Sequence, residues 1–317
     1  MENSNDLEYL FKAKIANEIS REIYWSHAKE IFQYLSRFTQ FQQTLENKVI
    51  LTDGEIIVDL KCTQSHEARI KMVLDPTDVR SVPFSTLCEG HYEKFHADLL
   101  FDLGKNSRYF LDIGANMGFY SIGLGLENPN LSIEAYEPQP GVMQSLERNI
   151  ELNELVGRVN VHNIGLSNQI GELKMYIPRF TGSGGGSFTN LHASEGEARE
   201  VIVKVVPLDQ HYKELVDLIK IDVEGFELNV ILGGINLIEK NKPSIVIELL
   251  RKWMKPFGHH PQEVVRILVK FGYQCYAIEK SSLRAIDEIN EETEETNFIF
   301  VHPSKIVHRA LVSALLS

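Results

Sequence analysis

Two acidic side chains flank a glycine-containing turn in the first half of the chain. The segment YFLDIGANMGFYS, residues 109–121, passes from an apolar run through Asp112 to Gly114 and Gly118, and Glu137 closes the next apolar run. In α/β nucleotide sites a carboxylate roughly 20 residues after the glycine turn binds the ribose hydroxyls. The spacing favours a nucleoside site, although each carboxylate alone could simply cap the helix that follows it.

The turn lacks the residues that hold a pyrophosphate or triphosphate. A dinucleotide fingerprint needs glycine at 114, 116 and 119, but Asn116 and Phe119 occupy two of these positions. A P-loop would end in Gly-Lys-Ser or Gly-Lys-Thr, and no lysine follows this turn. We therefore expect an adenosine-like ligand with little phosphate. Asp112 could orient the turn or attract a cationic group such as an ammonium.

A second group of carboxylates follows two later apolar runs. Asp222 and Glu224 come after the run at 217–221, and Glu248 ends the run at 243–248. They could bind a substrate hydroxyl, act as a base, or hold a divalent cation through oxygen ligands. Metal binding is not favoured, because no histidine or fourth ligand is fixed by spacing. We expect Glu227 only to stabilise the start of the following helix.

Other candidates lie in loops or inside a strand. His259 could act as a base, as could His260, although a pair of loop histidines is more often only solvated. Lys220 should support the nearby carboxylates by its charge. The glycine-rich segment TGSGGGSFTN, residues 181–190, could close over a substrate as a lid or could be a flexible hairpin tip.

The elements that must position these residues alternate between strand-like and helical runs. Strands are predicted at 109–114, 131–137, 159–165, 216–224, 243–250, 273–279 and 296–303, with helices from 118 and at 142–152, 226–238 and 261–271. This alternation predicts an α/β fold with a mostly parallel sheet covered on both faces. Because residues 281–296 look like a polar acidic loop, we expect the last two strands to be antiparallel. Residues 168–217 interrupt the pattern with two further strands.

The N-terminal part differs from the rest. Apolar residues recur at helical spacing from Leu7 to about Phe38, which predicts one or two amphipathic helices. Residues 49–74 show short strand-like runs separated by Asp53-Gly54, a hairpin signal. We predict an accessory region at 1–80 and a second domain at 81–317 that contains the 168–217 insertion.

Composition limits the partners. The chain has 317 residues and a net charge of −12, which opposes binding to nucleic acid or anionic lipid. The three cysteines are far apart and match no disulfide framework or zinc pattern, which fits a cytoplasmic protein. The start is polar and lacks a secretory pattern, and no run approaches the ~20 apolar residues of a membrane span. We expect a soluble protein.

Four segments together resemble the FkbM family of S-adenosylmethionine-dependent methyltransferases. They are FLDIGANMGFYS, AYEPQPGVMQSLERNIELN, VDLIKIDVEGFELNVILGG and PSIVIEL, and EGHYEKF at 89–95 is similar to that family's upstream segment. The resemblance covers about residues 89–250 and implies a class I methyltransferase, Rossmann-like sheet of seven strands whose last strand is antiparallel. The cofactor-binding residues that it implies are Tyr92, Glu93, Asp112, Gly114, Ala115, Asn116, Gly118, Tyr120, Glu137, Pro138, Asn163, Gly165, Leu166 and Asp222.

The resemblance also implies a reaction. FkbM-like enzymes are associated with methylation of hydroxyls on polyketides and on sugars of glycans or glycolipids, and we expect a sugar-type acceptor. Asp222, Glu224, Glu248 and His259 are the catalytic candidates. The alternatives are N-methylation of a small amine, or a non-catalytic cofactor-binding protein whose N-terminal helices dock a partner or a second copy of the chain.

Overall fold

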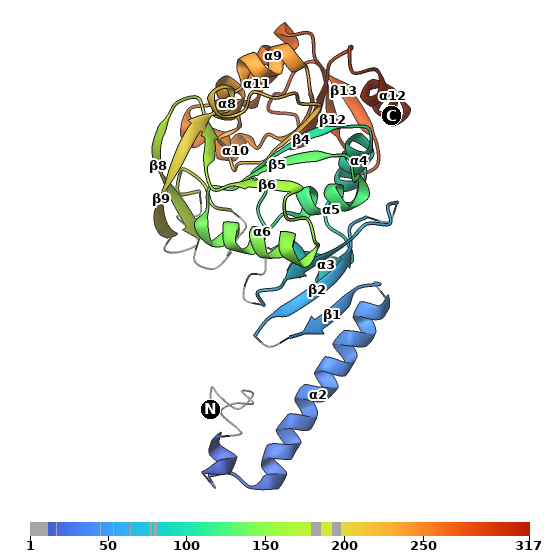
Figure 1. Ribbon diagram of the computed structural model, residues 1–317, viewed down its shortest axis with the longest axis vertical. Coiled ribbons are helices and arrows are strands. Elements are labelled where there is room, and N and C mark those ends of the chain that lie inside the picture. The colour runs from blue at the N-terminus through green and yellow to red at the C-terminus, as the bar shows by residue number, and fades with distance from the viewer. Residues whose placement is uncertain are drawn as a thin grey trace.

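An eight-stranded sheet forms the centre of the molecule (Figure 1). The computed structural model describes residues 12–317 except 17, 45, 53, 64, 77, 79, 80, 179–184 and 192–197. The strand order is β13-β12-β14-β11-β10-β4-β5-β6. Five neighbouring strands pair in parallel, namely β4 (Tyr109–Ile113), β5 (Ser132–Tyr136), the edge strand β6 (Val159–His162), β10 (Leu218–Ile221) and β11 (Ser244–Glu248).

The chain reverses direction at the far side of the sheet. Strand β14 (Asn297–Val301) lies between β11 and β12 (Gln274–Ile278) and is antiparallel to both. This arrangement confirms the antiparallel final pair and the class I methyltransferase type of sheet. The order reverses between β4 and β10, so the carboxyl ends of these two strands form the place where open α/β sheets bind ligands.

The sheet has one strand more than the seven predicted. Strand β13 (Leu283–Ile286) pairs antiparallel with β12, inside the segment that the sequence indicated to be only a loop. The strand has only four residues, Leu-Arg-Ala-Ile, which is too short for a clear alternating pattern, and its pairing depends on β12. At the edge, the backbone of Leu283 pairs with Leu315 and Ser317 near the end of the chain.

Helices cover both faces, and each face has its own hydrophobic cluster. One face carries α3 (Val82–Glu89), α4 (Lys94–Lys105), α5 (Phe119–Glu127), α6 (Pro140–Leu152) and α12 (Ile306–Ala314). The other carries α7 (Leu208–His211), α8 (Glu227–Gly233), α9 (Ile235–Asn241), α10 (Arg251–Met254) and α11 (Pro261–Lys270). The single helix predicted at 226–238 is therefore two helices, which meet at Gly234.

Gly234 separates α8 from α9 because it packs closely on α7. A Cβ atom at Gly234 would lie 2.9 Å from the Cδ2 of Leu208. Its φ of −116° and ψ of 18° also depart from helical values. The helical periodicity continued through this position, so the sequence pattern did not reveal the break.

The insertion forms a separate three-stranded sheet. The two strands predicted in this segment are β8 (Gly171–Pro178) and β9 (Ala198–Pro207), and they pair antiparallel. Strand β7 (Gly165–Ser167) directly follows β6 and pairs parallel with β9. The insertion is thereby attached to the carboxyl end of the third strand of the main sheet.

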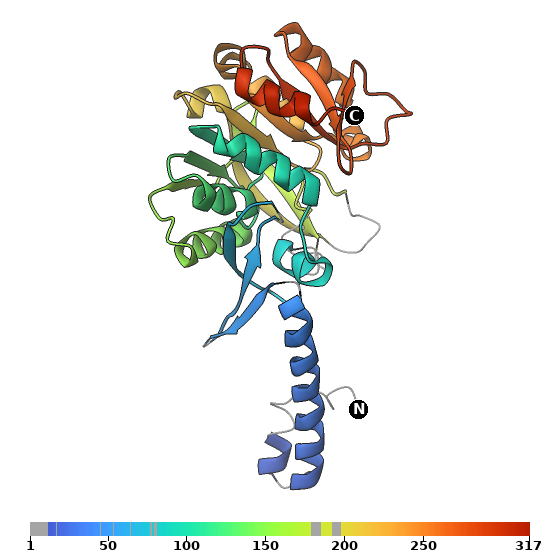
Figure 2. The same ribbon diagram turned by 90° about the vertical axis from the view of Figure 1, so that its right-hand side faces the viewer.

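The N-terminal helix α2 (Arg21–Thr44) extends away from the rest of the chain (Figures 1 and 2). It confirms the predicted helical character of this part, while Leu7 lies outside the described residues. Strands β1 (Lys48–Leu51), β2 (Ile56–Lys61) and β3 (Arg69–Val73) follow and form an antiparallel sheet. The predicted hairpin joins β1 to β2, although its Asp53 also lies outside the described residues.

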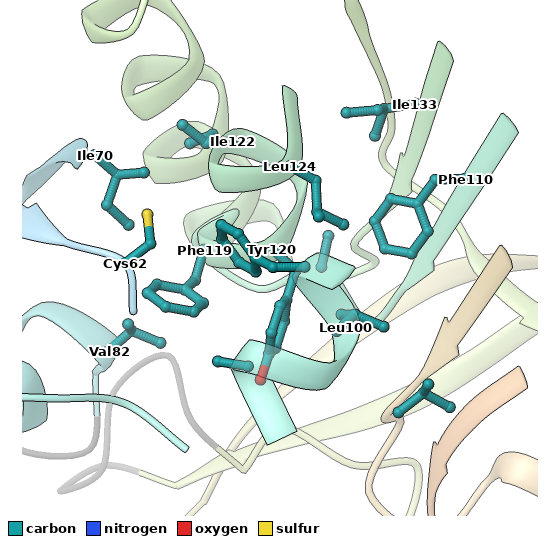
Figure 3. Close-up of a cluster of buried hydrophobic side chains, with 14 of the residues drawn as sticks. Cys62, Ile70, Val82, Leu100, Phe110, Phe119, Tyr120, Ile122, Leu124 and Ile133 are labelled. Atoms are coloured by element: carbon teal, nitrogen blue, oxygen red, sulfur yellow. The ribbon is translucent and has the colours of Figure 1, made fainter. Parts of the chain in front are cut away.

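This small sheet packs on helix α5. Cys62 and Ile70 lie beside Phe119 and Ile122 in one buried cluster (Figure 3). A Cβ atom at Gly123 would lie 3.1 Å from the Sγ of Cys62, so the surfaces are in close contact. The domain boundary at residue 80 stays a prediction.

Two asparagines of α6 close the open edge of β3. Asn149 accepts a hydrogen bond from the backbone N–H of Val73 at 2.8 Å and donates one to the carbonyl of Met117 at 2.9 Å. Asn153 bonds both the N–H and the carbonyl of Lys71. Asn149 is fully buried and thus joins the small sheet to the turn that follows β4.

We predict that Asn149→Ala lowers the free energy of unfolding by about 2–3 kcal/mol, because it leaves a buried carbonyl and a backbone N–H without their partners. Urea unfolding of both proteins measures the difference. Asn160→Ala is the matched control, since Asn160 is exposed and its amide bonds only Glu134. Equal losses in the two variants would contradict the role of Asn149.

Candidate functional site

A cavity lies at the carboxyl ends of β4, β5 and β10. We call it the glycine-turn cavity, because residues 113–117 form one wall. Residues 136–139, 164–166, 185–188, 220 and 222–224 line most of the remainder. The space between them is about 890 Å³, part of it open to solvent.

The glycines of the turn are required by its geometry. Gly114 has a φ of +79°, and a Cβ atom there would lie 1.8 Å from the carbonyl oxygen of Asp222. The N–H groups of Gly114 and Ala115 both donate to the carbonyl of Tyr136 at 3.0 Å. Gly118, with a φ of +91°, precedes α5. The turn therefore joins the ends of β4, β5 and β10 in one rigid unit.

Glu137 lies inside this wall with its carboxylate buried. Its Oε2 accepts from the N–H of Asn116 at 3.0 Å, and its Oε1 accepts from the N–H of Gln139 at 2.8 Å. Burial raises the pKa of Glu137 to about 7, although the two backbone donors act in the opposite direction. Glu137 is thus a carboxylate that further hydrogen-bond donors in the cavity would stabilise in its charged form.

The third strand contributes backbone and apolar surface. Gly165 and Leu166 line the cavity beside Pro138. Asn163 is not among the lining residues. Its amide donates to the carbonyls of Glu137 at 2.8 Å and Pro138 at 3.2 Å, so it holds the loop after β5 in place.

Asp112 lies behind the cavity. It is 1% exposed and is not a lining residue. Its Oδ2 accepts from the hydroxyl of Ser121 at 2.6 Å and from the same residue's N–H at 3.2 Å. Burial raises the pKa of Asp112, and the positive charge of Lys220 opposes this effect. Asp112 could act on a ligand only through its neighbours.

Lys220 lines the cavity and is paired with carboxylates. Its Nζ lies 3.3 Å from Oδ2 of Asp222 and 3.9 Å from Oδ1 of Asp112, and it donates to the carbonyl of Gly114 at 3.0 Å. Burial acts to lower the pKa of Lys220, but the charges of Asp222, Asp112 and Glu93 together raise it. Lys220 therefore stays charged and serves the structure, as the sequence indicated.

The upstream segment supplies one aromatic side chain, Tyr92, and the carboxylate of Glu93, and both lie near Tyr120 of α5. Tyr92 and Tyr120 line the cavity. Glu93 does not, and lines a neighbouring cleft instead. The hydroxyl of Tyr120 donates to Oε2 of Glu93 at 2.6 Å. Glu93 thus lies between the two openings.

The second carboxylate group lies partly inside the cavity. Asp222 and Glu224 line it, whereas Glu248, at the end of β11, does not. Burial and the negative charges of Asp222, Glu224 and Glu93 raise the pKa of Glu248 far above its usual range. Glu248 is consequently protonated and uncharged at neutral pH. It can donate a hydrogen bond but cannot serve as a base.

Glu227 stabilises the turn before α8. Its Oε1 accepts from the N–H groups of Val223 at 3.3 Å and Gly225 at 3.0 Å. Burial raises its pKa to about 7. The side chain lies at the start of the helix, as predicted, and is not a lining residue of the cavity.

The two loop histidines lie elsewhere. His260 caps α11, where its Nδ1 accepts from the N–H of Gln262 at 3.1 Å. His259 lines a different cleft and stacks on Phe257, with ring centroids 6.1 Å apart. The structure therefore does not bring His259 to the glycine-turn cavity with Asp222, and its proposed role as a base has no geometric support.

Several lining residues had no signal in the sequence. Met175 and Phe188 come from the insertion, and Tyr136 and Gln139 flank Glu137. The hydroxyl of Ser187 donates to the carbonyl of Glu224 at 2.8 Å. The last part of the glycine-rich segment therefore covers the cavity, and only its glycine content indicated such a loop.

Three residues of the site have left-handed backbone without being glycine. Their φ values are 41° at Glu93, 51° at Asn116 and 55° at Glu224. This conformation is uncommon for side chains of this kind and concentrates at functional sites. Asn116 and Glu224 line the glycine-turn cavity, and Glu93 lines the neighbouring cleft.

The charges of the cavity suit a nucleoside that carries an ammonium group. Among the described residues that line it, Lys220 is the one lysine or arginine, and its charge is matched by Asp222 and Asp112. A pyrophosphate would find no further cation there.

Within the described part of the chain, no three His, Cys, Asp or Glu side chains are grouped to hold a metal ion. The alternative metal set of Asp222, Glu224 and Glu248 stays a prediction.

Comparison with known proteins gives one family and several distant relatives. Residues 112–275 match the methyltransferase FkbM domain. The chain is 25% identical over 206 residues to methyltransferase sdnD of Sordaria araneosa, which covers 54% of this chain and 76% of that protein. It is 28% identical over 149 residues to methyltransferase 1 of Beauveria bassiana (strain ARSEF 2860), which covers 39% of this chain and 57% of that protein.

A solved structure of methyltransferase FkbM from Methylobacillus flagellatus KT is also similar. It shares 18% sequence identity with this chain at a TM-score of 0.39. The similarity covers 62% of this chain and 44% of that one.

Proposed function

The chain belongs to the methyltransferase FkbM domain family, and we propose that it transfers a methyl group from S-adenosyl-L-methionine to a hydroxyl of a sugar, a glycan or a related natural product. The observation that supports this cofactor is the buried carboxylate of Glu137 beside a glycine turn that has no spare cation for a phosphate. Such a wall suits a ribose without a pyrophosphate.

We assign the parts of the cofactor to residues by their chemistry. Glu137 would accept from the ribose hydroxyls, and the apolar surface of Leu166 and Phe188 would cover the adenine. Asp222, which lines the cavity, would attract the ammonium group. When bound, the sulfonium supplies a methyl group that is already activated, so the protein's main task is to position the acceptor and exclude water.

The acceptor hydroxyl would bind on the side of Asp222 and Glu224. These carboxylates can accept hydrogen bonds from an alcohol, and protonated Glu248 can donate one. N-methylation of an amine is the alternative, which a carboxylate-rich site would also accommodate. A screen of methyl glycosides and small amines with labelled methyl donor separates O-methylation from N-methylation.

Metal assistance stays the less favoured alternative. Unchanged turnover in the presence of a chelator would argue against it.

We further propose a cytoplasmic location and no nucleic-acid partner. The net charge of −12 disfavours polyanions. Cys62, Cys88 and Cys275 are free, which suits a reducing compartment. In the part of the chain that the structure describes, no helix has the length and apolar content to span a bilayer. Fractionation of the native cells would test the location.

Helix α2 suits association with a second copy of the chain. Tyr24, Ala28, Ile31, Leu35 and Phe38 follow the alternating spacing of four and three residues that marks a coiled-coil seam. Leu35 is 45% exposed and Phe38 is 38% exposed on the extended helix. The charged residues of α2 lie off these positions and nearly balance, at three basic and two acidic. Pairing with itself therefore opposes no like charges along the seam.

We predict that the full chain sediments as a dimer of twice 36.1 kDa, because pairing of α2 would bury the exposed apolar surface of Leu35 and Phe38. Leu35→Glu with Phe38→Glu should produce a monomer, since it buries two charges in the seam. Gln33→Glu, on the opposite face of α2, is the control. A wild-type protein that is monomeric at micromolar concentration would contradict the pairing. A monomeric double variant that binds the cofactor normally would show that association is separate from the active site.

We predict that S-adenosylhomocysteine binds in calorimetric titration and that Glu137→Ala weakens binding roughly 10- to 100-fold, through loss of charge-assisted hydrogen bonds. The affinity should also depend on pH. Donors from the ribose favour the charged carboxylate, whose pKa is about 7 in the free protein. Affinity is therefore highest above pH 7 and falls about tenfold per unit below it.

Glu137→Gln should abolish this pH dependence, because the amide does not titrate. Glu151→Ala is the control, since its side chain is exposed on α6. Absence of binding to both S-adenosylmethionine and its product would remove the proposed cofactor. Unchanged affinity in Glu137→Ala would remove only the assigned ribose contact.

We predict that Glu224→Gln lowers turnover by roughly 100-fold while affinity for S-adenosylhomocysteine changes less than tenfold, whereas Asp222→Asn lowers both turnover and affinity, because Asp222 is also assigned to the ammonium group. The amides keep the shape of the cavity but accept hydrogen bonds more weakly. Initial rates with the acceptor found in the screen measure the effect. Full turnover in both variants would exclude a catalytic role for these two carboxylates.

A further inference from the structure

A second opening lies beside the glycine-turn cavity, and we call it the outer cleft. It is lined by residues 93–96 at the start of α4, 278–280 at the end of β12 and 294–297 before β14. The end of β11 adjoins it, because Glu248 pairs with Asn297 and the N–H of Leu249 donates to the carbonyl of Thr296. The outer cleft thus occupies the same carboxyl edge of the sheet as the cavity.

One pair of side chains connects the two openings. Tyr120 lines the glycine-turn cavity, and its hydroxyl donates to Glu93, which lines the outer cleft. The wall of the cleft is braced by Arg284, which bonds both Glu279 at 2.8 Å and Glu295 at 2.6 Å. An acceptor in this cleft would therefore meet a fixed carboxylate-rich surface next to the methyl-donor site.

His96 stands in the outer cleft one turn after Glu93. Its Nδ1 lies 3.1 Å from Oε2 of Glu93, and its side chain is 11% exposed. Both ring nitrogens are buried, and neither has a partner in hydrogen-bond geometry within the described residues, so Glu93 is the ion-pair neighbour of Nδ1 and Nε2 has no such neighbour. A carboxylate next to Nδ1 favours the tautomer with the proton on Nδ1, which leaves the lone pair of Nε2 free to accept a proton.

The carboxylate beside His96 is held in its charged form. Burial acts to raise the pKa of Glu93, but His96, Tyr120 and Lys220 together lower it to about 2. The other acidic groups are less suited to be the base. Asp222 is paired with Lys220 at 3.3 Å, and Glu248 already carries a proton at neutral pH.

We propose that the outer cleft receives the acceptor and that His96 is the general base that takes the hydroxyl proton, with Glu93 as its positioning residue. This inference rests on the proposed function. The acceptor oxygen forms a bond to the methyl carbon while the bond from carbon to sulfur breaks and its electron pair stays on sulfur. The hydroxyl proton passes to Nε2 of His96, where the Glu93 carboxylate stabilises the resulting imidazolium.

The tautomer of His96 tests the proposal without an acceptor. The full chain is labelled with ¹⁵N at its 11 histidines, saturated with S-adenosylhomocysteine, and studied by long-range proton–nitrogen correlation at pH 8, with His96→Asn for assignment. We expect a protonated Nδ1 and a bare Nε2. In Glu93→Gln both tautomers should be populated, because the charge that selects one is lost.

His162 is the internal control, because its Nε2 lies 2.6 Å from Glu134 on another strand and should not respond to Glu93→Gln. A His96 with its proton on Nε2, or an imidazolium at pH 8, would overturn the proposal. So would a tautomer that is the same in wild type and Glu93→Gln.

Turnover gives the second measurement, with labelled methyl donor and a panel of methyl glycosides. We expect His96→Asn to lower kcat by roughly 100- to 10,000-fold with unchanged affinity for S-adenosylhomocysteine, and His302→Asn, a remote histidine, to leave kcat unchanged. Full turnover in His96→Asn would overturn the proposed role of His96 as the general base.

Failure of the wild type to bind S-adenosylhomocysteine would instead contradict the proposed cofactor. Binding without methylation of any glycoside would contradict the acceptor class, and the tautomer would then decide the role of His96.

Discussion

The ammonium group of Lys220, buried at the centre of the sheet, is the constraint on which the site depends. A charge removed from water costs several kcal/mol unless partners surround it. Here the partners are Asp112 on β4, Asp222 after β10 and the carbonyl of Gly114. Folding must therefore bring the glycine turn and two strand ends to one point. The same requirement fixes the wall in which Glu137 is held.

Charge balance explains the differences among the acidic residues around this point. Asp112, Asp222, Glu224, Glu93 and Glu248 are close enough to influence one another, and Lys220 is the cation that their interactions share. Glu248 is deeply buried among negative charges and has no cation in contact within the described residues, so its charged form is unfavourable and it retains its proton. Glu93 remains charged because Tyr120 and His96 are beside it. One cluster thus contains both hydrogen-bond donors and acceptors.

Much of this arrangement could be predicted from local sequence. The glycine turn and Glu137 were found because buried parallel strands read as apolar runs and because tight turns require glycine. Strand β13 and the wall formed by Phe188 were missed, since both depend on pairing between distant segments. His96 was missed for the same reason. Its cleft combines the starts of α4 and β14 with the end of β12, and no spacing in the sequence encodes their meeting.

The left-handed backbone at Glu93, Asn116 and Glu224 has a consequence for how the protein could evolve. Each such residue costs of order 1–3 kcal/mol, which glycine would largely avoid. Selection for stability alone would therefore replace these three side chains, and selection for methyl transfer would retain them. The site is a place where thermal robustness and activity compete. Variants selected for heat resistance alone should therefore acquire glycine at these positions, whereas variants selected for heat resistance together with activity should keep the three side chains.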